Sequence, residues 1–417
     1  MKTPYHTFVG IDRSDQKIDI AVRHHDSLAE HVISTKPEAL RDWVHALRKT
    51  YPDGQIAICI EQPCANLAIF LHQFDFLDLF LINPIMLKRY RESFHLARAK
   101  DDRKDSHCIA ELLEERYAKL KVWKPDSPSA RKLRALTEHR RTLVDTRTAI
   151  SNQLTALLKL YFPHALELTG KYLYAQLACD FLLKWPSLQT LKRAQNKTIV
   201  QFYRLHSSYR PQLMEDRLNI IEEAIPITDD EALLEASSLM MTALVKQLNT
   251  LRTQIESFDQ EIAQVMTELE DAPLFETLPG AGSVLSARLA ATFGSDRERF
   301  DNAAGLQCFT GIAPVTKASG KKHHIHRRYA SRTCPHFEHQ SFMEWVGLTI
   351  PKSLWAKAYY RQQRERGSGH YTALRALAYK WQRILYRCWK NRTPYDEETY
   401  LTALKKRHSP LVKKIQE

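Results

Sequence analysis

The first part of the chain places short apolar runs between amphipathic segments, a pattern typical of an α/β domain. Residues 8–12 are an apolar run that ends in an acid, residues 17–22 alternate between apolar and polar side chains, and residues 56–60 are an apolar run directly before an acid. Pro37 begins a segment whose apolar side chains recur at helical spacing. We predict a mixed sheet covered by helices over residues 1–125. Strands are expected at residues 8–12, 17–22, 31–34, 56–60 and 79–82, with helices after Pro37, near residues 65–73 and after Pro84.

Between residues 126 and 271 the apolar side chains recur at helical or heptad-like spacing instead. Leucines and isoleucines keep this spacing through residues 133–158 and again through residues 244–262. We predict two long, coiled-coil-like helices, with an irregular helical insertion over residues 164–230 between them. The pattern allows the two helices to pair as an antiparallel hairpin, and it equally allows them to pair with partner chains.

The last part of the chain is predicted to be a mainly α-helical domain over residues 272–400. Tight turns are expected at residues 278–282 and 309–314, and a stretch rich in Lys, His and Arg follows over residues 317–332. The aromatic residues after residue 338 recur at helical spacing, so we expect most of them to be packed and the arginines between them to face nucleic acid. Residues 401–417 are expected to be a polar tail, frayed from Lys405 to Glu417.

The charge of the chain points to a polyanionic partner. Its 61 Lys and Arg exceed its 48 Asp and Glu, which gives a net charge of +13. Nucleic acid is the first candidate partner and an anionic membrane surface the second. No apolar stretch approaches the ~20 residues that span a bilayer, and the N-terminus lacks the features of a signal peptide. Seven cysteines, odd in number and spread along the chain, argue against a disulfide framework, and the lack of a CxxC pair argues against a zinc ribbon or a redox site. We therefore expect a cytoplasmic protein.

Four acidic residues stand where a metal site could form. Asp12 ends the first strand, Glu61 ends a later strand, and Asp102 and Asp105 lie three residues apart at the start of a helix. Acids in these positions can meet at the carboxyl edge of an open α/β sheet. Carboxylate oxygens select Mg²⁺ or Mn²⁺, and two such ions can serve phosphoryl transfer. Asp102 and Asp105 alone also fit ordinary first-turn acids that stabilise a helix dipole. We expect the neighbouring acids to be solvated: Asp15, Asp19 and Asp101.

The order and spacing of these motifs resemble the DEDD transposases and recombinases of the IS110 type, relatives of the Piv-type DNA invertases. The resemblance spans roughly residues 7–160 and 272–400. Its motifs are Gly10-Ile11-Asp12, Ile60-Glu61, Lys100-x-Asp102-x-x-Asp105, Leu278 to Gly282, Phe309 to Pro314, Ser319-Gly320 and Arg366-Gly367-x-x-His370.

This resemblance implies an RNase H-like fold of the RuvC type for the first domain and a transposase domain with a nucleophilic serine at the other end. Carried over by motif, Asp12, Glu61, Asp102 and Asp105 hold the catalytic metal, and Ser319 is the nucleophile. The resemblance also implies a homo-oligomer, a dimer or a tetramer, and a structured bridge-type guide RNA that pairs with donor and target DNA. The sequence departs from the family pattern after Ser319, which keeps Ser331 as a second candidate nucleophile.

Basic residues near the candidate nucleophile fit a DNA backbone. On its own, Ser319 precedes a glycine in a basic loop and could make an ordinary turn, because no His or Asp pattern marks it as activated. The lysines and arginines around it are expected to contact phosphates: Lys317, Lys321, Lys322, Arg327 and Arg328. On the first long helix, Arg140, Arg141 and Arg147 either follow a duplex or form a solvated face. The histidines near Cys334 lack the paired cysteines of a zinc knuckle.

We therefore predict a DNA transposase or site-specific recombinase of an insertion sequence. A serine oxygen would attack the scissile phosphorus while Mg²⁺ stabilises the developing charge and the 3′-oxygen leaves. One alternative is a RuvC-like nuclease or resolvase that uses the same acids with water as the nucleophile. The other is a nucleic-acid-binding assembly protein whose acids have no catalytic role.

Overall fold

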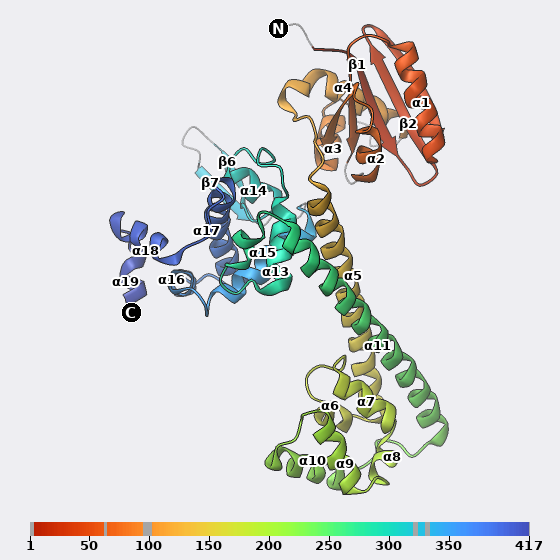
Figure 1. The fold of residues 1–417 in the computed structure, drawn as a ribbon, viewed down its shortest axis with the longest axis vertical. Helices are drawn as coiled ribbons and strands as arrows, with labels where there is room; N and C mark the ends of the chain where they lie inside the picture. The colour runs from red at the N-terminus through yellow and green to blue at the C-terminus, as the bar shows by residue number, and fades with distance from the viewer. Residues whose placement is uncertain (1–3, 62–64, 95–101, 320–323, 330–333, 417) are drawn as a thin grey trace. The chain divides into compact units, whose positions relative to one another are not determined.

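The structure is a computed structural model that describes residues 4–61, 65–94, 102–319, 324–329 and 334–416 (Figure 1). Two compact units make up the chain, residues 1–126 and residues 127–417. None of the helices in these described ranges is long and apolar enough to cross a membrane. The predicted boundaries within the second unit stay predictions.

A five-stranded mixed sheet forms the first unit, in the strand order β3-β2-β1-β4-β5. Strand β1 pairs antiparallel with β2 and parallel with β4, and β4 pairs parallel with β5. The strands are β1 (Tyr5–Arg13), β2 (Lys17–His24), β3 (Ser27–Ser34), β4 (Gln55–Glu61) and β5 (Leu77–Ile82). All five expected strands are confirmed, and each extends further than its apolar run indicated.

Helices cover both faces of this sheet. Because successive side chains of a strand point to opposite faces, β1 contributes Val9 and Ile11 to one core and Phe8 to the other. The first core also contains Leu40 of α1, and the second contains Ile109 of α4. The helices of this unit are α1 (Pro37–Thr50), α2 (Ala65–Leu71), α3 (Pro84–Phe94) and α4 (Asp102–Arg116), and a 3₁₀ helix follows at Tyr117–Lys119.

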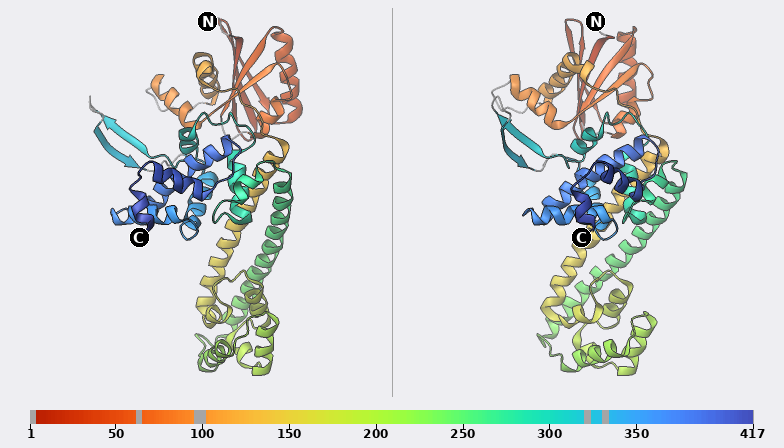
Figure 2. Two further views of the ribbon diagram at one scale, coloured as in Figure 1. Left: turned by 60° about the vertical axis from the view of Figure 1, so that its left-hand side comes forward. Right: turned by 90° about the vertical axis from the view of Figure 1, so that its left-hand side faces the viewer.

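Two long helices, α5 (Pro128–Tyr161) and α11 (Glu231–Glu268), lie side by side in the second unit (Figures 1 and 2). Their ion pairs fix an antiparallel register, because Lys132 near the start of α5 pairs with Glu261 near the end of α11. Apolar residues of both helices pack in one core, among them Leu154 and Leu248. The chain therefore satisfies this apolar seam by itself, as an antiparallel hairpin.

A helical lobe lies between the two long helices in sequence, as predicted for residues 164–230. Its core holds Phe181 and Tyr203, both fully buried. Pro211 stands in the first turn of α10, where the lack of an N–H costs nothing. The lobe consists of α6 (His164–Thr169), α7 (Gln176–Lys184), α8 (Leu188–Lys192), α9 (Asn196–Leu205) and α10 (Pro211–Glu223).

The C-terminal part packs helices around four fully buried tryptophans, Trp345, Trp355, Trp381 and Trp389, which confirms that these aromatics are core. Gly280 turns the chain at φ +74°, and a Cβ there would lie 2.5 Å from the carbonyl oxygen of Leu348. The helices are α12 (Ala272–Glu276), α13 (Gly282–Phe293), α14 (Ala303–Phe309), α15 (His336–Thr349), α16 (Leu354–Glu365), α17 (His370–Lys390), α18 (Glu397–Lys406) and α19 (Leu411–Gln416), and the strands are β6 (Val315–Ser319) and β7 (His324–Tyr329).

Two expectations for this part are wrong. The basic stretch expected to be a loop contains an antiparallel hairpin of β6 and β7. The tail expected to be frayed forms α18 and α19, because Leu404 and Leu411 are buried in the core and α19 packs on α16.

Candidate active site

Asp12 and Glu61 lie at the carboxyl ends of two neighbouring parallel strands, Glu61 as the last residue of β4 and Asp12 as the last but one of β1. The register of β1 and β4 pairs Gly10 with Cys59 and Ile11 with Ile60, and each acid is the next residue along its strand. Both side chains are partly exposed. Since side chains alternate along a strand, Asp12 shares the face of Gly10 and Glu61 shares that of Cys59, so the two acids lie on the same face.

Helix α4 covers this face and begins near the same edge. A Cβ on Gly10 would lie 2.1 Å from the carbonyl oxygen of Ser106, so only glycine allows α4 to approach this closely. Further back along β1, the ring of Phe8 lies 5.8 Å from that of Tyr117, just after α4. The helix therefore runs antiparallel to β1, and its first turn lies toward Asp12. Asp102 and Asp105 both stand in that part of α4.

Asp105 is 7% exposed, and its Oδ1 accepts a hydrogen bond from Nη1 of Arg91 at 2.6 Å. This contact joins α3 to α4, and it raises the pKa of the Arg91 guanidinium above its usual value. Asp102 is the first residue of α4, and its side chain lies outside the described residues. The structure thus brings Asp12, Glu61 and the start of α4 to one edge of the sheet.

Asp19, which the sequence suggested would be solvated, is 2% exposed. It stands directly opposite Asp12 in the antiparallel register of β1 and β2, so its side chain lies on the same face of the sheet. The expectation was wrong because α4 covers β2 as well, through an ion pair of Arg23 with Glu114 at 2.6 Å. Asp15, in the turn between these strands, is exposed as expected, and Asp101 lies outside the described residues.

The chemistry of these side chains fits a hard divalent cation, since carboxylate oxygens are the ligands that Mg²⁺ and Mn²⁺ prefer. Among the described side chains, no three His, Cys, Asp or Glu side chains lie close enough together to hold a metal ion. Asp105 is engaged by Arg91, and a metal at this edge would have to compete with that guanidinium. The donor set therefore fits Mg²⁺ or Mn²⁺.

Ser319 is the last residue of β6, in the second unit. Its backbone pairs with that of His324, and Lys317 pairs with Arg327 across the same hairpin. The serine therefore ends a strand, where the sequence suggested a turn. Thr316 pairs with Arg328. Three residues predicted for this site lie outside the described residues: Lys321, Lys322 and Ser331.

The three arginines predicted to follow a duplex each have a partner within the chain. Arg140 donates to both carboxylate oxygens of Asp259 on α11, at 2.5 and 3.1 Å. Arg141 donates to Glu344 of α15 at 3.2 Å and to Asp145 at 2.6 Å. The Arg147 guanidinium lies 3.9 Å from the centre of the Tyr174 ring. These contacts stabilise the hairpin and its neighbours, a role that the sequence could not reveal without the register of the helices.

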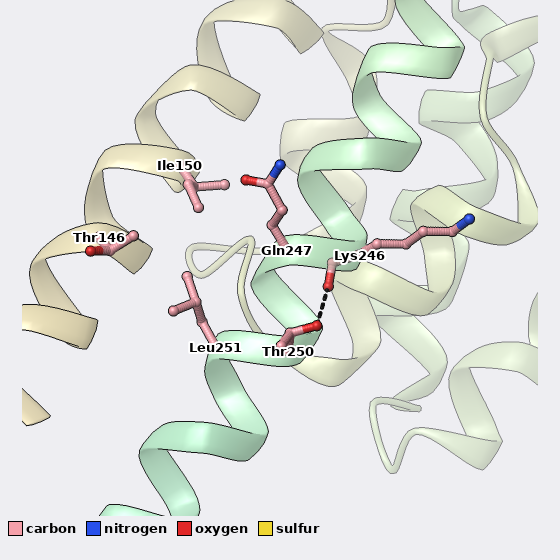
Figure 3. A pocket seen from close by; sticks show the side chains of 6 residues that line it. All are labelled: Thr146, Ile150, Lys246, Gln247, Thr250 and Leu251. Atoms are coloured by element: carbon pink, nitrogen blue, oxygen red, sulfur yellow. Dashed lines mark hydrogen bonds between the residues drawn. The ribbon is translucent and has the colours of Figure 1, made fainter.

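A cavity of about 400 Å³ opens between the two long helices (Figure 3). Ile150 of α5 and Leu251 of α11 give it an apolar wall, and Thr250 Oγ1 donates to the Lys246 carbonyl at 3.1 Å. Lys246 is the one ionisable residue among the six that line it, the others being Thr146, Ile150, Gln247, Thr250 and Leu251. The cavity lacks the acid–base groups that catalysis needs, so the sheet edge is the better candidate.

Two transposase family models match this chain. A DEDD transposase model of the IS110 type matches residues 9–163, which include Asp12, Glu61, Asp102 and Asp105. The model described as "Transposase IS116/IS110/IS902 family" matches residues 272–361, which include Ser319. Together the two matches cover more than half of the chain.

Proteins of insertion elements are similar over most of their length. The mini-circle protein of IS117 from Streptomyces coelicolor is 28% identical over 330 residues, which are 78% of this chain and 79% of that protein. The 43.6 kDa protein of IS110 from the same organism is 24% identical over 75% of this chain and 76% of its own length. The 44.8 kDa protein of IS116 from Streptomyces clavuligerus is 26% identical over 69% and 70%. This chain therefore belongs to the IS110 family of insertion-sequence transposases, enzymes that cut and rejoin DNA.

Proposed function

We propose that this transposase cuts and rejoins DNA by metal-dependent phosphoryl transfer at the edge of its sheet, where Asp12, Glu61, Asp102 and Asp105 hold the metal. The observation that carries the proposal is the register of β1 and β4, in which Ile11 pairs with Ile60 and the two acids follow side by side. The mixed sheet is compatible with an RNase H-like fold of the RuvC type.

The four carboxylates would bind Mg²⁺ or Mn²⁺, and the bound ion would stabilise negative charge on the phosphoryl oxygens. Backbone packing and strand pairing position these acids. Gly10 lets α4 lie against the sheet, and the pairing of β1 with β4 fixes the backbone of Asp12 and Glu61. Fixed donors of this kind need little reorganisation when the charge develops.

Ser319 is our candidate for the nucleophile. Its Oγ would attack the scissile phosphorus and form a serine–phosphate bond while the bond from phosphorus to the 3′-oxygen breaks, and overall the serine proton would pass to that oxygen, which leaves as a 3′-hydroxyl. The new ester keeps the energy of the broken one, so strands can be rejoined without ATP. Basic residues of the hairpin, among them Lys317, Arg327 and Arg328, support this choice, since cations near Ser319 would attract the DNA backbone.

A structured guide RNA, a homo-oligomer and a cytoplasmic location complete the proposal. The net charge of +13 supports binding to nucleic acid in general. Base pairing with a guide would choose the donor and target sequences, while the protein would contact the backbone. An RNA requirement is testable by adding the transcript of the element's non-coding end to purified protein and DNA.

Trapping of a covalent protein–DNA adduct tests the chemistry. Protein, the element's DNA junction, the adjacent transcript and Mg²⁺ are mixed and run on a denaturing gel, with Ser319→Ala and Asp12→Ala in parallel. We expect an adduct with the wild type that both substitutions abolish. If DNA is cleaved without forming an adduct, and Ser319→Ala still cleaves it, the enzyme is instead a nuclease that uses water. If the protein binds DNA but does not cleave it with or without metal, it is a nucleic-acid-binding assembly protein.

A further inference from the structure

Asp19 is an acid buried beside the proposed metal ligands. It is 2% exposed and stands opposite Asp12 across the β1–β2 pair. Side chains directly opposite in an antiparallel pair have Cβ atoms roughly 4.5–5.5 Å apart. Two carboxylates so close together repel each other, and the cost rises when one of them is shielded from water.

Lys17 compensates part of this charge. It precedes Asp19 by two residues, on the same face of β2, and its Nζ lies 2.9 Å from Oδ2 and donates to Oδ1 at 3.2 Å. Oδ2 itself accepts no hydrogen bond from the described residues. The Lys17 side chain is 43% exposed, so its charge is partly screened by water. A partly exposed cation therefore lies beside a buried carboxylate that stands opposite a second acid on β1.

We infer that Asp19 is a positioning residue for the metal, and that the Lys17–Asp19 pair sets how tightly Asp12 holds it. This inference rests on the proposed metal site. The Asp19 carboxylate strengthens the negative potential behind Asp12, and Lys17 both fixes that carboxylate and moderates its charge. Groups just outside the ligands of a metal typically change its affinity by roughly 10–100-fold when they are replaced.

Substitutions at the two residues of this ion pair are expected to change the affinity for Mn²⁺ in opposite directions. Asp19→Asn removes a negative charge and is expected to weaken binding of Mn²⁺ by roughly 10–100-fold. Lys17→Gln removes a positive charge and is expected to tighten binding. A purely structural ion pair would behave differently, since loss of either partner would lower the stability of the chain and leave the metal affinity unchanged.

Calorimetric titration of the full chain with Mn²⁺ tests these two expected changes in affinity in the absence of DNA. Asp15→Asn is the matched control, because it removes an exposed acid from the turn next to β2 and should leave the affinity unchanged. Equal affinities for wild type and Asp19→Asn would overturn the inference, as would weaker binding in Lys17→Gln. If Asp19→Asn does not fold, the Lys17→Gln titration decides alone. If the wild type binds Mn²⁺ no more tightly than Asp12→Asn does, the proposed metal site itself is contradicted.

Discussion

Nη1 of Arg91 lies 2.6 Å from Oδ1 of Asp105, so a guanidinium from α3 holds an acid of α4 near the sheet edge where Asp12 and Glu61 lie at the carboxyl ends of their strands. The pair is half-hidden, with side-chain exposures of 29% for Arg91 and 10% for Asp105. Arg91 thus places a positive charge beside Asp105, where a divalent cation would also bring one. Metal binding at Asp105 must displace or share this arginine.

Arg91→Gln should therefore lower the metal concentration that half-saturates the chain. Removing the competing charge is expected to raise the affinity for Mn²⁺ by about tenfold, equivalent to ~1.4 kcal/mol. Loss of the ion pair should lower the free energy of unfolding by about 1 kcal/mol, because the pair is partly exposed. Calorimetric titration and urea unfolding measure the two effects, with the exposed Arg89→Gln on the same helix as the control. Weaker metal binding in Arg91→Gln would mean that Arg91 orients Asp105.

Gly10→Ala should destabilise the first unit severely. The added Cβ would lie 2.1 Å from the Ser106 carbonyl oxygen and 2.5 Å from the Ala110 nitrogen, both backbone atoms that cannot rotate away. Overpacking of this kind costs roughly 1–3 kcal/mol and occasionally more, and we expect the upper end. Gly347→Ala is the control, because a Cβ there meets nothing within 4 Å and α15 gains a better helix former. Equal stability of the two variants in urea unfolding would contradict the close approach of α4.

Arg140 is expected to act through Asp259 rather than through nucleic acid. Arg140→Ala and Asp259→Ala should each destabilise the hairpin, with a coupling energy of roughly 0.5–3 kcal/mol in the double-mutant cycle. The salt dependence of DNA binding tests whether Arg140 contacts a phosphate instead. A phosphate contact by Arg140 would reduce the slope of log K against log salt by about 1 in Arg140→Ala alone, and we expect no such change.

His24 should make the first unit less stable in mild acid. Burial lowers the pKa of His24 below 6.5, with smaller contributions from the charges of His25 and His6, and Nδ1 lies 2.8 Å from the Thr7 hydroxyl. The unfolded chain therefore takes up a proton before the folded one, and stability that is complete above pH 6.5 is lost as the pH falls through that value. Hydrogen exchange of β1 and β2 amides should show this loss. It should shrink in His24→Gln and persist in the exposed His31→Gln.

The sequence revealed those features whose signal is local. Apolar runs that end in an acid identified β1 and β4, and with them Asp12 and Glu61. The burial of Asp19 could not be predicted, because β2 alternates in the same way whether its polar face is exposed to water or covered by a helix. Only the packing of α4 on β2 distinguishes these two cases. The partner of Arg140 was hidden for a similar reason, since it depends on the register of two helices about a hundred residues apart.

Iron-dependent cleavage of the backbone would test most directly the claim that this edge binds the catalytic metal. Fe²⁺ substituted for Mg²⁺ and treated with peroxide and ascorbate produces radicals that cut the chain next to the bound ion. The account predicts cuts near residues 12, 61 and 102–105, competed by Mg²⁺ and absent in Asp12→Asn. Cuts elsewhere, or the same cuts in Asp12→Asn, would contradict it.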